Sequence, residues 1–145
     1  MSGPGRTVTW RVHLASARAD VYEILTSGPG RARFWAQSAV ERDGRVEFHF
    51  PNGTRWSSVV LERDPPTRFA LTYIGGSRAT FELAAADDGG TDVTLIDTDV
   101  PKAEYEDAHA GWVSVLLALK AAADFGVDLR NHDERRTWDD GYVDN

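Results

Sequence analysis

Three residues in the second half of the sequence have side chains that could act together on a small molecule: Asp97, His109 and Trp112. His109 and Trp112 are three residues apart in an apolar stretch with helical spacing, so one helix face is predicted to carry both. Asp97 has the parity of the apolar residues in its strand, which predicts an inward-facing carboxylate. A desolvated carboxylate beside an imidazole is an acid–base pair suited to proton abstraction or dehydration.

Each of these side chains also has a plainer interpretation. His109 would bond a backbone carbonyl if the helix simply packs on strands, and Trp112 would then anchor the core. Asp97 would be solvated in a turn if its strand ended at Ile96. Glu62, just before an Asp-Pro-Pro turn, is a second candidate for an inward carboxylate, with a solvated strand end as its alternative.

The other histidines do not indicate a metal site. His49 alternates with Phe48 and Phe50 and is expected to face solvent, as is His13, and His132 lies in a polar segment. The four histidines share no spacing typical of metal ligands, and the absence of cysteine excludes thiolate ligands and a thiolate nucleophile. We therefore expect neither a metal nor a cofactor.

The hydrophobic pattern predicts the elements that would position these residues. Alternation over residues 7–14 predicts a half-buried strand, and the following segments predict two short helices, 16–25 with a Ser16 cap and 31–36. Alternating segments separated by turn signals such as RDG and PNG then predict consecutive hairpins. The long helix is predicted from Lys102 to Phe125, with Gly126 as its C-cap.

These elements predict one α+β domain over residues 1–145, in which a curved antiparallel sheet of about seven strands wraps around the long C-terminal helix. Only that helix is large enough to cover the apolar face of the sheet. We expect a cavity between them, open at one end and walled by bulky side chains. The residues expected to contact a ligand there are Trp35, Phe48, Phe50, Trp56, Tyr73, Phe81, His109, Trp112 and Leu116.

The net charge and the hydrophobic pattern limit the binding partners and the cellular location that we expect. A net charge of −7 argues against a nucleic-acid surface and against binding to an anionic membrane. No apolar run is typical of a signal peptide or a membrane span, so we expect a cytoplasmic protein. Residues 1–6 are expected to be disordered. Residues 127–145 are expected to form a polar tail that Leu129, Trp138 and Tyr142 could hold against the body.

Four segments resemble the START/Bet v 1-like superfamily, which has the helix-grip fold. SARADVYEILTSGPGRARFW resembles its opening helices, and VVLERDPPTRFALTY resembles its strand, Asp-Pro-Pro turn and strand. ATFELAAADDGGTDVTLIDTDVP resembles the next hairpin, and HAGWVSVLLALKAAAD resembles the last helix, with His109 and Gly111–Trp112 in place. The match runs from Thr7 to Gly126. It is closest to the group similar to the C-terminal domain of the activator of Hsp90 ATPase and to bacterial polyketide cyclase-like proteins.

This superfamily includes lipid carriers, hormone receptors, cyclases and chaperone regulators, so the resemblance leaves three functions open. The leading expectation is binding of a small hydrophobic or aromatic molecule between sheet and helix. The second is an enzyme of the cyclase or dehydratase kind that uses Asp97 and His109. The third is a chaperone-regulating or protein-interaction domain with a filled interior. A homodimer is a further expectation, formed through outward-facing residues of the sheet: Val59, Leu61, Ile74 and Ile96.

Overall fold

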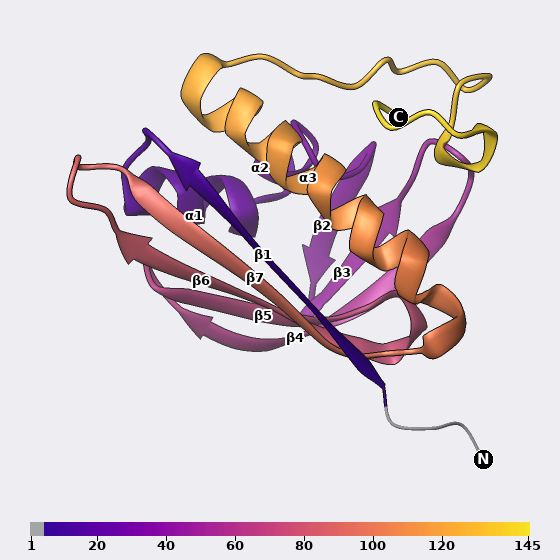
Figure 1. The fold of residues 1–145 in the computed structure, drawn as a ribbon, viewed down its shortest axis with the longest axis horizontal. Helices are drawn as coiled ribbons and strands as arrows, with labels where there is room; N and C mark the ends of the chain where they lie inside the picture. The colour runs from indigo at the N-terminus through magenta and orange to yellow at the C-terminus, as the bar shows by residue number, and fades with distance from the viewer. Residues whose placement is uncertain (1–4) are drawn as a thin grey trace.

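The computed structural model describes residues 5–145 and contains a seven-stranded antiparallel sheet with its helices on one face (Figure 1). The strands lie in the order β1-β7-β6-β5-β4-β3-β2, so the first strand pairs with the last and all other neighbours are consecutive in the chain. The strands are β1 (Arg6–Leu14), β2 (Ser38–Arg42), β3 (Arg45–His49), β4 (Arg55–Asp64), β5 (Arg68–Tyr73), β6 (Ser77–Ala85) and β7 (Thr91–Val100). The helices are α1 (Arg18–Thr26), α2 (Gly28–Arg31) and α3 (Tyr105–Phe125).

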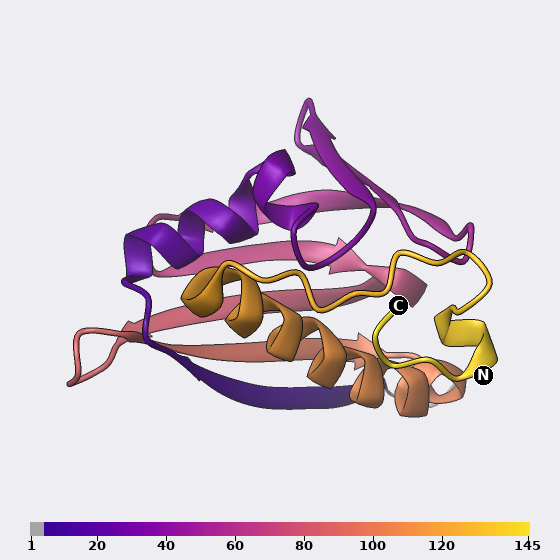
Figure 2. The same ribbon diagram turned by 90° about the horizontal axis from the view of Figure 1, so that it is seen from above.

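The sheet is strongly curved, and α3 crosses its concave face (Figures 1 and 2). Helix α3 packs most extensively on the β1 edge, while α1 and α2 lie beside it on the same side of the sheet. Side chains that alternate toward this face form one buried core with the helices. The predicted helix-grip architecture, with about seven strands and a long C-terminal helix, is therefore confirmed.

The long helix ends where the sequence predicts. Gly126 adopts a left-handed conformation with φ of 65°, and its N–H donates to the Ala122 carbonyl. The next N–H, of Val127, reaches back to the Ala121 carbonyl, which completes a glycine-based C-cap. At the other end, Lys102–Glu104 forms a separate 3₁₀ turn before the α-helix begins at Tyr105.

The two short helices differ in detail from the prediction. Ser16 does not cap α1, because its hydroxyl instead donates to the Ala123 carbonyl and to Asp124 at the C-terminal end of α3, both at 2.8 Å. Helix α2 begins at Gly28 rather than at residue 31, and its cap is Ser27, whose hydroxyl accepts from the Gly30 N–H at 3.0 Å. The turn that follows α2 buries Phe34 and Trp35.

The C-terminal segment 127–145 is docked on the domain rather than extended away from it. In Figure 2 it runs between α3 and the β2–β3 hairpin. The Arg130 guanidinium, 9% exposed, donates to the carbonyls of Ala32 and Ala36 after α2. Trp138 lies over α3, where a Cβ on Gly111 would be 3.9 Å from its ring.

Only part of this docking follows from the hydrophobic residues of the segment. Leu129 and Tyr142 remain 51% and 40% exposed, so they do not anchor the segment as expected, whereas Trp138 does. The charged Arg130, which hydropathy would place in solvent, is the buried anchor. Of the residues expected to be disordered, 1–4 lie outside the described part of the chain, and Arg6 is the first residue of β1.

Candidate functional site

Five aromatic side chains meet between the concave face of the sheet and α3. Trp35 is at the centre of the cluster, and its ring centroid lies 4.9 Å from that of Phe48 and 5.8 Å from that of Trp112. Phe81 and Tyr73 complete the cluster at 5.5 Å and 5.7 Å from Trp35. We call these five residues the aromatic cluster. It brings together rings from the α2–β2 turn, three strands and α3, all of them predicted site residues.

The other apolar residues of the predicted site surround this cluster. Phe50 stacks on Phe48 with centroids 5.7 Å apart and planes inclined by only 4°. Trp56 lies opposite Phe48 in the β3–β4 register, and Leu116 is buried one turn of α3 beyond Trp112. Phe50 and Trp56 are half-buried, so the cluster reaches the surface at their end of the sheet.

His109 lies away from the cluster, over the β1 edge. Its ring contacts Trp10 at 4.8 Å and stacks on Tyr105 at 5.5 Å. Its backbone carbonyl accepts from the Trp10 indole N–H at 3.0 Å, which fixes α3 to β1 at this point. No hydrogen bond or ion pair joins His109 to Asp97 within residues 5–145. The structure therefore does not bring together the two groups of the predicted acid–base pair.

Asp97 points inward, as its parity predicts, and is 1% exposed. It pairs with Val8 of β1 and Ala79 of β6, so the strand does not end before it. The Trp112 indole N–H donates to Asp97 Oδ2 at 2.9 Å. Burial raises the pKa of the Asp97 carboxyl, and the Ser77 hydroxyl and the indole N–H act in the opposite direction.

Asp97 Oδ1 is one of five buried side-chain polar atoms that lack hydrogen-bond partners within residues 5–145. The Ser77 hydroxyl lies close enough to Asp97 to lower the pKa of its carboxyl by hydrogen bonding, although the two groups fall outside strict hydrogen-bond geometry. Four of the five such atoms lie on the strands β4, β6 and β7, and we call them the polar row: Trp56 Nε1, Ser58 Oγ, Ser77 Oγ and Asp97 Oδ1. The fifth, Tyr22 Oη, lies on α1. Folded proteins leave few such groups unpaired, because each costs about 1–3 kcal/mol.

Tyr73 supplies a further polar group beside this row. Its hydroxyl accepts from the Trp35 indole N–H at 2.9 Å, and burial raises the pKa of the hydroxyl well above its ordinary value. Tyr73 therefore stays neutral across the physiological range. Its own O–H remains free to donate, because an indole N–H can only be a donor.

Glu62 does not face the interior. A β-bulge in β4 shifts the register between Val60 and Glu62, so the parity that points Trp56 inward is reversed beyond it. The Glu62 carboxylate instead pairs on the outer face with Arg68 at 3.0 Å and Arg78 at 3.3 Å. The solvated alternative is correct for Glu62, although the strand continues past it to Asp64.

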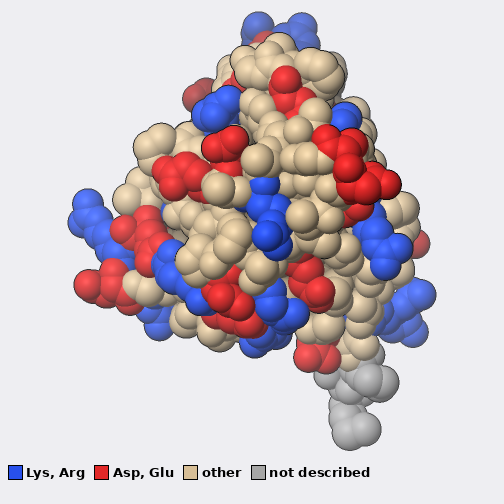
Figure 3. Space-filling view, turned by 90° about the vertical axis from the view of Figure 1, so that its left-hand side faces the viewer, with Lys and Arg blue, Asp and Glu red and all other residues tan. Residues whose placement is uncertain are grey.

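His13 also lies on the outer face, as expected. Its ring nitrogens contact Asp92 at 2.8 Å and Asp88 at 2.6 Å, and these two carboxylates raise the pKa of His13. Within residues 5–145, no group of three or more His, Asp and Glu side chains has the arrangement of a metal site. On the side of the molecule in Figure 3, acidic and basic side chains are interspersed rather than segregated.

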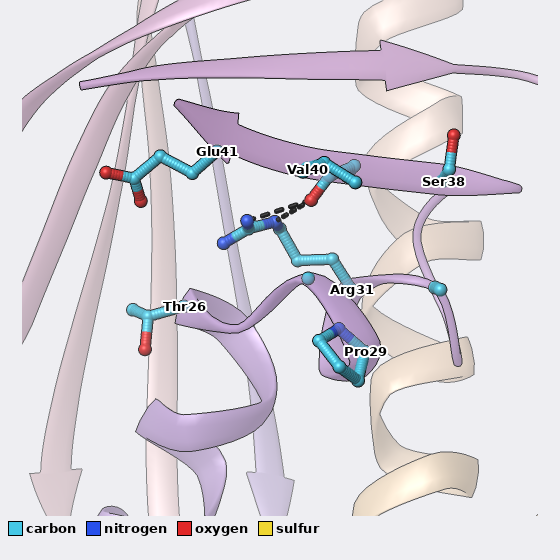
Figure 4. A pocket seen from close by; sticks show the side chains of 9 residues that line it. Thr26, Pro29, Arg31, Ser38, Val40 and Glu41 are labelled. Carbon is cyan, nitrogen blue, oxygen red and sulfur yellow. Dashed lines mark hydrogen bonds between the residues drawn. The ribbon is translucent and has the colours of Figure 1, made fainter. Parts of the chain in front are cut away.

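Two cavities open at the surface, and neither lies between the sheet and α3, where the sequence predicts one; only the second touches the predicted site, at Phe50. The first, of about 470 Å³, is bounded by Pro29, Val40 and Glu41 next to the edge strand β2 (Figure 4). Arg31 reaches its base and donates from Nε and Nη2 to the Ala39 carbonyl and from Nη1 to the Leu25 carbonyl. Because Arg31 is completely buried, its guanidinium holds α1 and β2 together and is not presented to a ligand.

The second cavity, of about 480 Å³, lies between the β3–β4 turn and the C-terminal segment. Phe50, Asn52 and Arg55 line it from the hairpin, and Glu134 and Thr137 line it from the segment. Asn52 Nδ2 also donates to Asp139 at 3.2 Å across the same gap. Phe50 therefore connects this polar cavity to the interior aromatic cluster through its stacking on Phe48.

The fold and the aromatic interior define an α+β protein of the helix-grip class. The chain belongs to the Activator of Hsp90 ATPase homolog 1-like family, whose model matches residues 15–124. The C-terminal segment that carries Arg130 and Trp138 lies beyond this match. No curated protein matches the sequence significantly. No helix in the described chain has the length and hydropathy that a membrane crossing requires.

Solved structures share the fold at low sequence identity. The Aha1 dimer from Colwellia psychrerythraea matches with a TM-score of 0.75 and 19% identity, covering 83% of this chain and 98% of that one. SSP2350 from Staphylococcus saprophyticus matches at 0.74 and 20% identity, covering 86% and 96%. DynU16, a putative protein of the dynemicin biosynthetic locus, matches at 0.72 and 18% identity, covering 86% of this chain and 49% of that one. These similarities establish the fold.

Proposed function

We propose that this protein binds a small, mainly apolar or aromatic molecule in its interior, between the concave face of the sheet and α3. The observation that carries the proposal is the row of unpaired polar atoms beside the aromatic cluster. A core that served only stability would gain by replacing Ser58 and Ser77 with apolar residues, because an unpaired buried hydroxyl costs free energy. A bound ligand with hydrogen-bonding groups would supply the partners that these atoms lack.

The surrounding side chains suit such a ligand. The aromatic cluster offers large apolar surfaces and flat faces, while few polar groups are available to orient what binds. Entry is most direct at the end where Phe50 and Trp56 are half-buried. Rotation of the two rings there would open a path from the second cavity to Phe48 and on to Trp35.

A pair of matched variants tests the proposal with the neutral fluorescent probe N-phenyl-1-naphthylamine. Ser58→Leu fills the interior beside the cluster, whereas Ser57→Leu places the same side chain on the outer face of the same strand. We expect the wild type and Ser57→Leu to bind the probe, and Ser58→Leu to lose binding while it stays folded. Equal probe binding by both variants would show that the probe occupies another part of the protein, and the proposal would be wrong.

A protein-interaction role is the second candidate, and one observation favours it. Val113 and Leu117, one turn apart on the outer side of α3, are 37% and 51% exposed. Leu61 and Ile74 add exposed apolar area elsewhere, and the Colwellia Aha1 structure is a dimer. Replacing Val113 and Leu117 by Lys should then lower self-association or partner capture without affecting probe binding. The enzymatic alternative is less favoured, because His109 and Asp97 have different partners.

A further inference from the structure

Asp97 is a buried carboxylate without a counter-charge. It lies between two neighbouring strands, in the last third of its own strand, and is 1% exposed. No Lys, Arg or His of residues 5–145 forms an ion pair with it, in contrast to the surface carboxylates Asp92 and Asp128. An isolated buried carboxylate is among the most costly groups that a core can contain.

Within residues 5–145, the Asp97 side chain accepts one hydrogen bond. Its donor is the Trp112 indole N–H, and the acceptor is Oδ2. Asp97 Oδ1 is left as an unused acceptor, and the nearby Ser77 hydroxyl is also unpaired. Both oxygens belong to the interior to which we assign ligand binding. A ligand atom placed there would meet one carboxylate oxygen and one hydroxyl oxygen.

The rings beside Asp97 favour positive charge. The Trp112 ring lies 4.9 Å from Tyr73 and 5.7 Å from Phe81, measured between centroids. Aromatic faces attract cations, most strongly those of Trp and Tyr, and this attraction increases when water is excluded. Trp112 turns its N–H edge to Asp97, so an organic ammonium group held at the other carboxylate oxygen would have to pack against the ring faces of Trp112 and Tyr73 beside it.

We propose that the ligand is an amine: an apolar or aromatic molecule whose ammonium group donates to Asp97 Oδ1 and to the Ser77 hydroxyl and packs against Trp112 and Tyr73. This inference rests on the proposed function and names its ligand class. The ammonium supplies the missing counter-charge, while the apolar body would pack against Trp35 and Phe81 once these rings move apart to admit it. Amine and carboxylate form a charge-assisted hydrogen bond, and no covalent step is involved.

The protonation of Asp97 gives this site a pH dependence. Burial raises the pKa of its carboxyl, so protons compete with the ammonium for the same oxygens. The groups that face Asp97 are the Ser77 hydroxyl from β6, the Tyr73 hydroxyl from β5 and the Trp112 indole from α3, while Val8 of β1 is apolar. Tyr73 stays neutral, so Asp97 is the one group among these whose change of charge would affect amine binding.

Three probes of matched shape test the amine: 1-naphthylmethylamine, 1-naphthalenemethanol and 1-methylnaphthalene. Their dissociation constants would be measured on the full chain by the change in protein amide NMR shifts. We expect the amine to bind about tenfold or more tightly than the alcohol, because only the amine forms an ion pair with Asp97. The amine should also bind more tightly as the pH rises from acid to neutral, while the alcohol should change little.

Two variants that each remove one negative charge test whether the preference for the amine depends on Asp97. Asp97→Asn keeps an acceptor for Trp112 and removes the charge, and it should lower amine affinity about tenfold with little effect on the alcohol. Asp99→Asn is the control, because Asp99 is exposed on the same strand and its φ of 58° is a conformation that Asn tolerates. It should leave all three affinities unchanged.

The outcomes distinguish two claims: that the ligand is an amine, and that any small molecule binds in the interior. If amine and alcohol bind the wild type equally, with no pH dependence, the amine inference is overturned while interior binding stands. If all three probes fail to bind, both are overturned. If Asp97→Asn does not fold, the wild-type comparison of amine with alcohol across pH still decides, because it requires no variant.

Discussion

The Trp112 indole N–H donates to Asp97 Oδ2 at 2.9 Å, and this bond ties α3 to β7 inside the core. Neither residue approaches the surface, with exposures of 2% and 1%. The bond fixes how α3 lies across the sheet and leaves one carboxylate oxygen for another donor. Positioning of the helix and binding of a ligand thus depend on the same carboxylate.

Trp112→Phe should destabilise the fold more than a similar change elsewhere, since it leaves the whole buried carboxylate without a donor. Trp10→Phe is the matched control, because its indole donates at 3.0 Å to a neutral carbonyl in a half-buried position. We expect a free energy of unfolding lower by about 1 kcal/mol in Trp112→Phe than in the control, measured by urea denaturation followed by circular dichroism. Equal losses would mean that the Asp97 carboxylate does not depend on this bond.

Asp97→Asn should change the pH dependence of stability in a defined direction. Burial places the folded-state pKa of Asp97 above its unfolded value of 3.8, so between these two pKa values the folded protein binds more protons. The contribution of Asp97 to stability is therefore fully present below pH 3.8 and is lost as the pH rises through the folded pKa. Relative to wild type, Asp97→Asn should become more stable as the pH rises from 4 to 7.

Urea midpoints of both proteins across that pH range would measure this difference. Other acids, such as Asp88, act in the opposite direction but cancel in the comparison, because both proteins contain them. A difference that stays constant with pH would refute the raised pKa of Asp97.

His13 should stabilise the protein only on the acid side of its titration. Asp92 and Asp88 raise its folded pKa above 6.5, so its contribution is fully present below pH 6.5 and disappears as the pH rises through the folded pKa. His13→Gln should thus be less stable than wild type near pH 6, with the difference fading toward higher pH. Thermal melts of both proteins with Asp88→Asn and Asp92→Asn added provide the control, in which the pH-dependent difference should vanish.

Arg130 should be essential for docking of residues 127–145. Its guanidinium donates to Asp128 at 2.9 Å and to the Ala36 carbonyl at 2.6 Å. Burial acts to raise the pKa of Asp128, but the hydrogen bonds from Arg130 outweigh it and lower that pKa. Arg130→Ala should lower the free energy of unfolding by about 1.5–3 kcal/mol per lost charged hydrogen bond that water cannot replace. Arg130→Lys should not restore it, because Lys lacks the planar donor pair.

Arg135→Ala is the control for Arg130, because its side chain is 85% exposed in the same segment. It should leave stability unchanged within about 0.5 kcal/mol. Hydrogen exchange of the segment should rise in Arg130→Ala alone. Unchanged exchange there would show that Trp138 and the Asn52–Asp139 contact suffice for docking.

Much of the fold could be predicted from the sequence, because it depends on local patterns. Period-two alternation and turn residues identified the strands, and Gly126 marked the end of α3. The inward direction of Asp97 followed from the same alternation. Glu62 shows the limit of this reasoning, since a single bulge reverses parity and leaves no clear signature in the sequence.

The predicted site was harder to derive, since it depends on how the elements pack. His109 and Trp112 share a helix face, but the crossing of α3 over β1 directs one to Trp10 and the other to Asp97. Burial of Arg31 and Arg130 could not be read from the chain, because the partners that draw them into the interior are backbone carbonyls, which have no residue signature. The inward parity of Ser58 and Ser77 was the signal for the polar row that the sequence analysis missed.

Native mass spectrometry of the purified full chain tests interior binding most directly, with spectra recorded as purified and after addition of N-phenyl-1-naphthylamine. We expect the folded protein to carry a discrete extra mass that denaturation releases, with the wild type taking up one probe molecule and Ser58→Leu taking up none. A folded protein that carries no small molecule and binds the probe no better than Ser58→Leu does would contradict interior binding. The filled core would then leave the exposed residues of α3 as the functional surface.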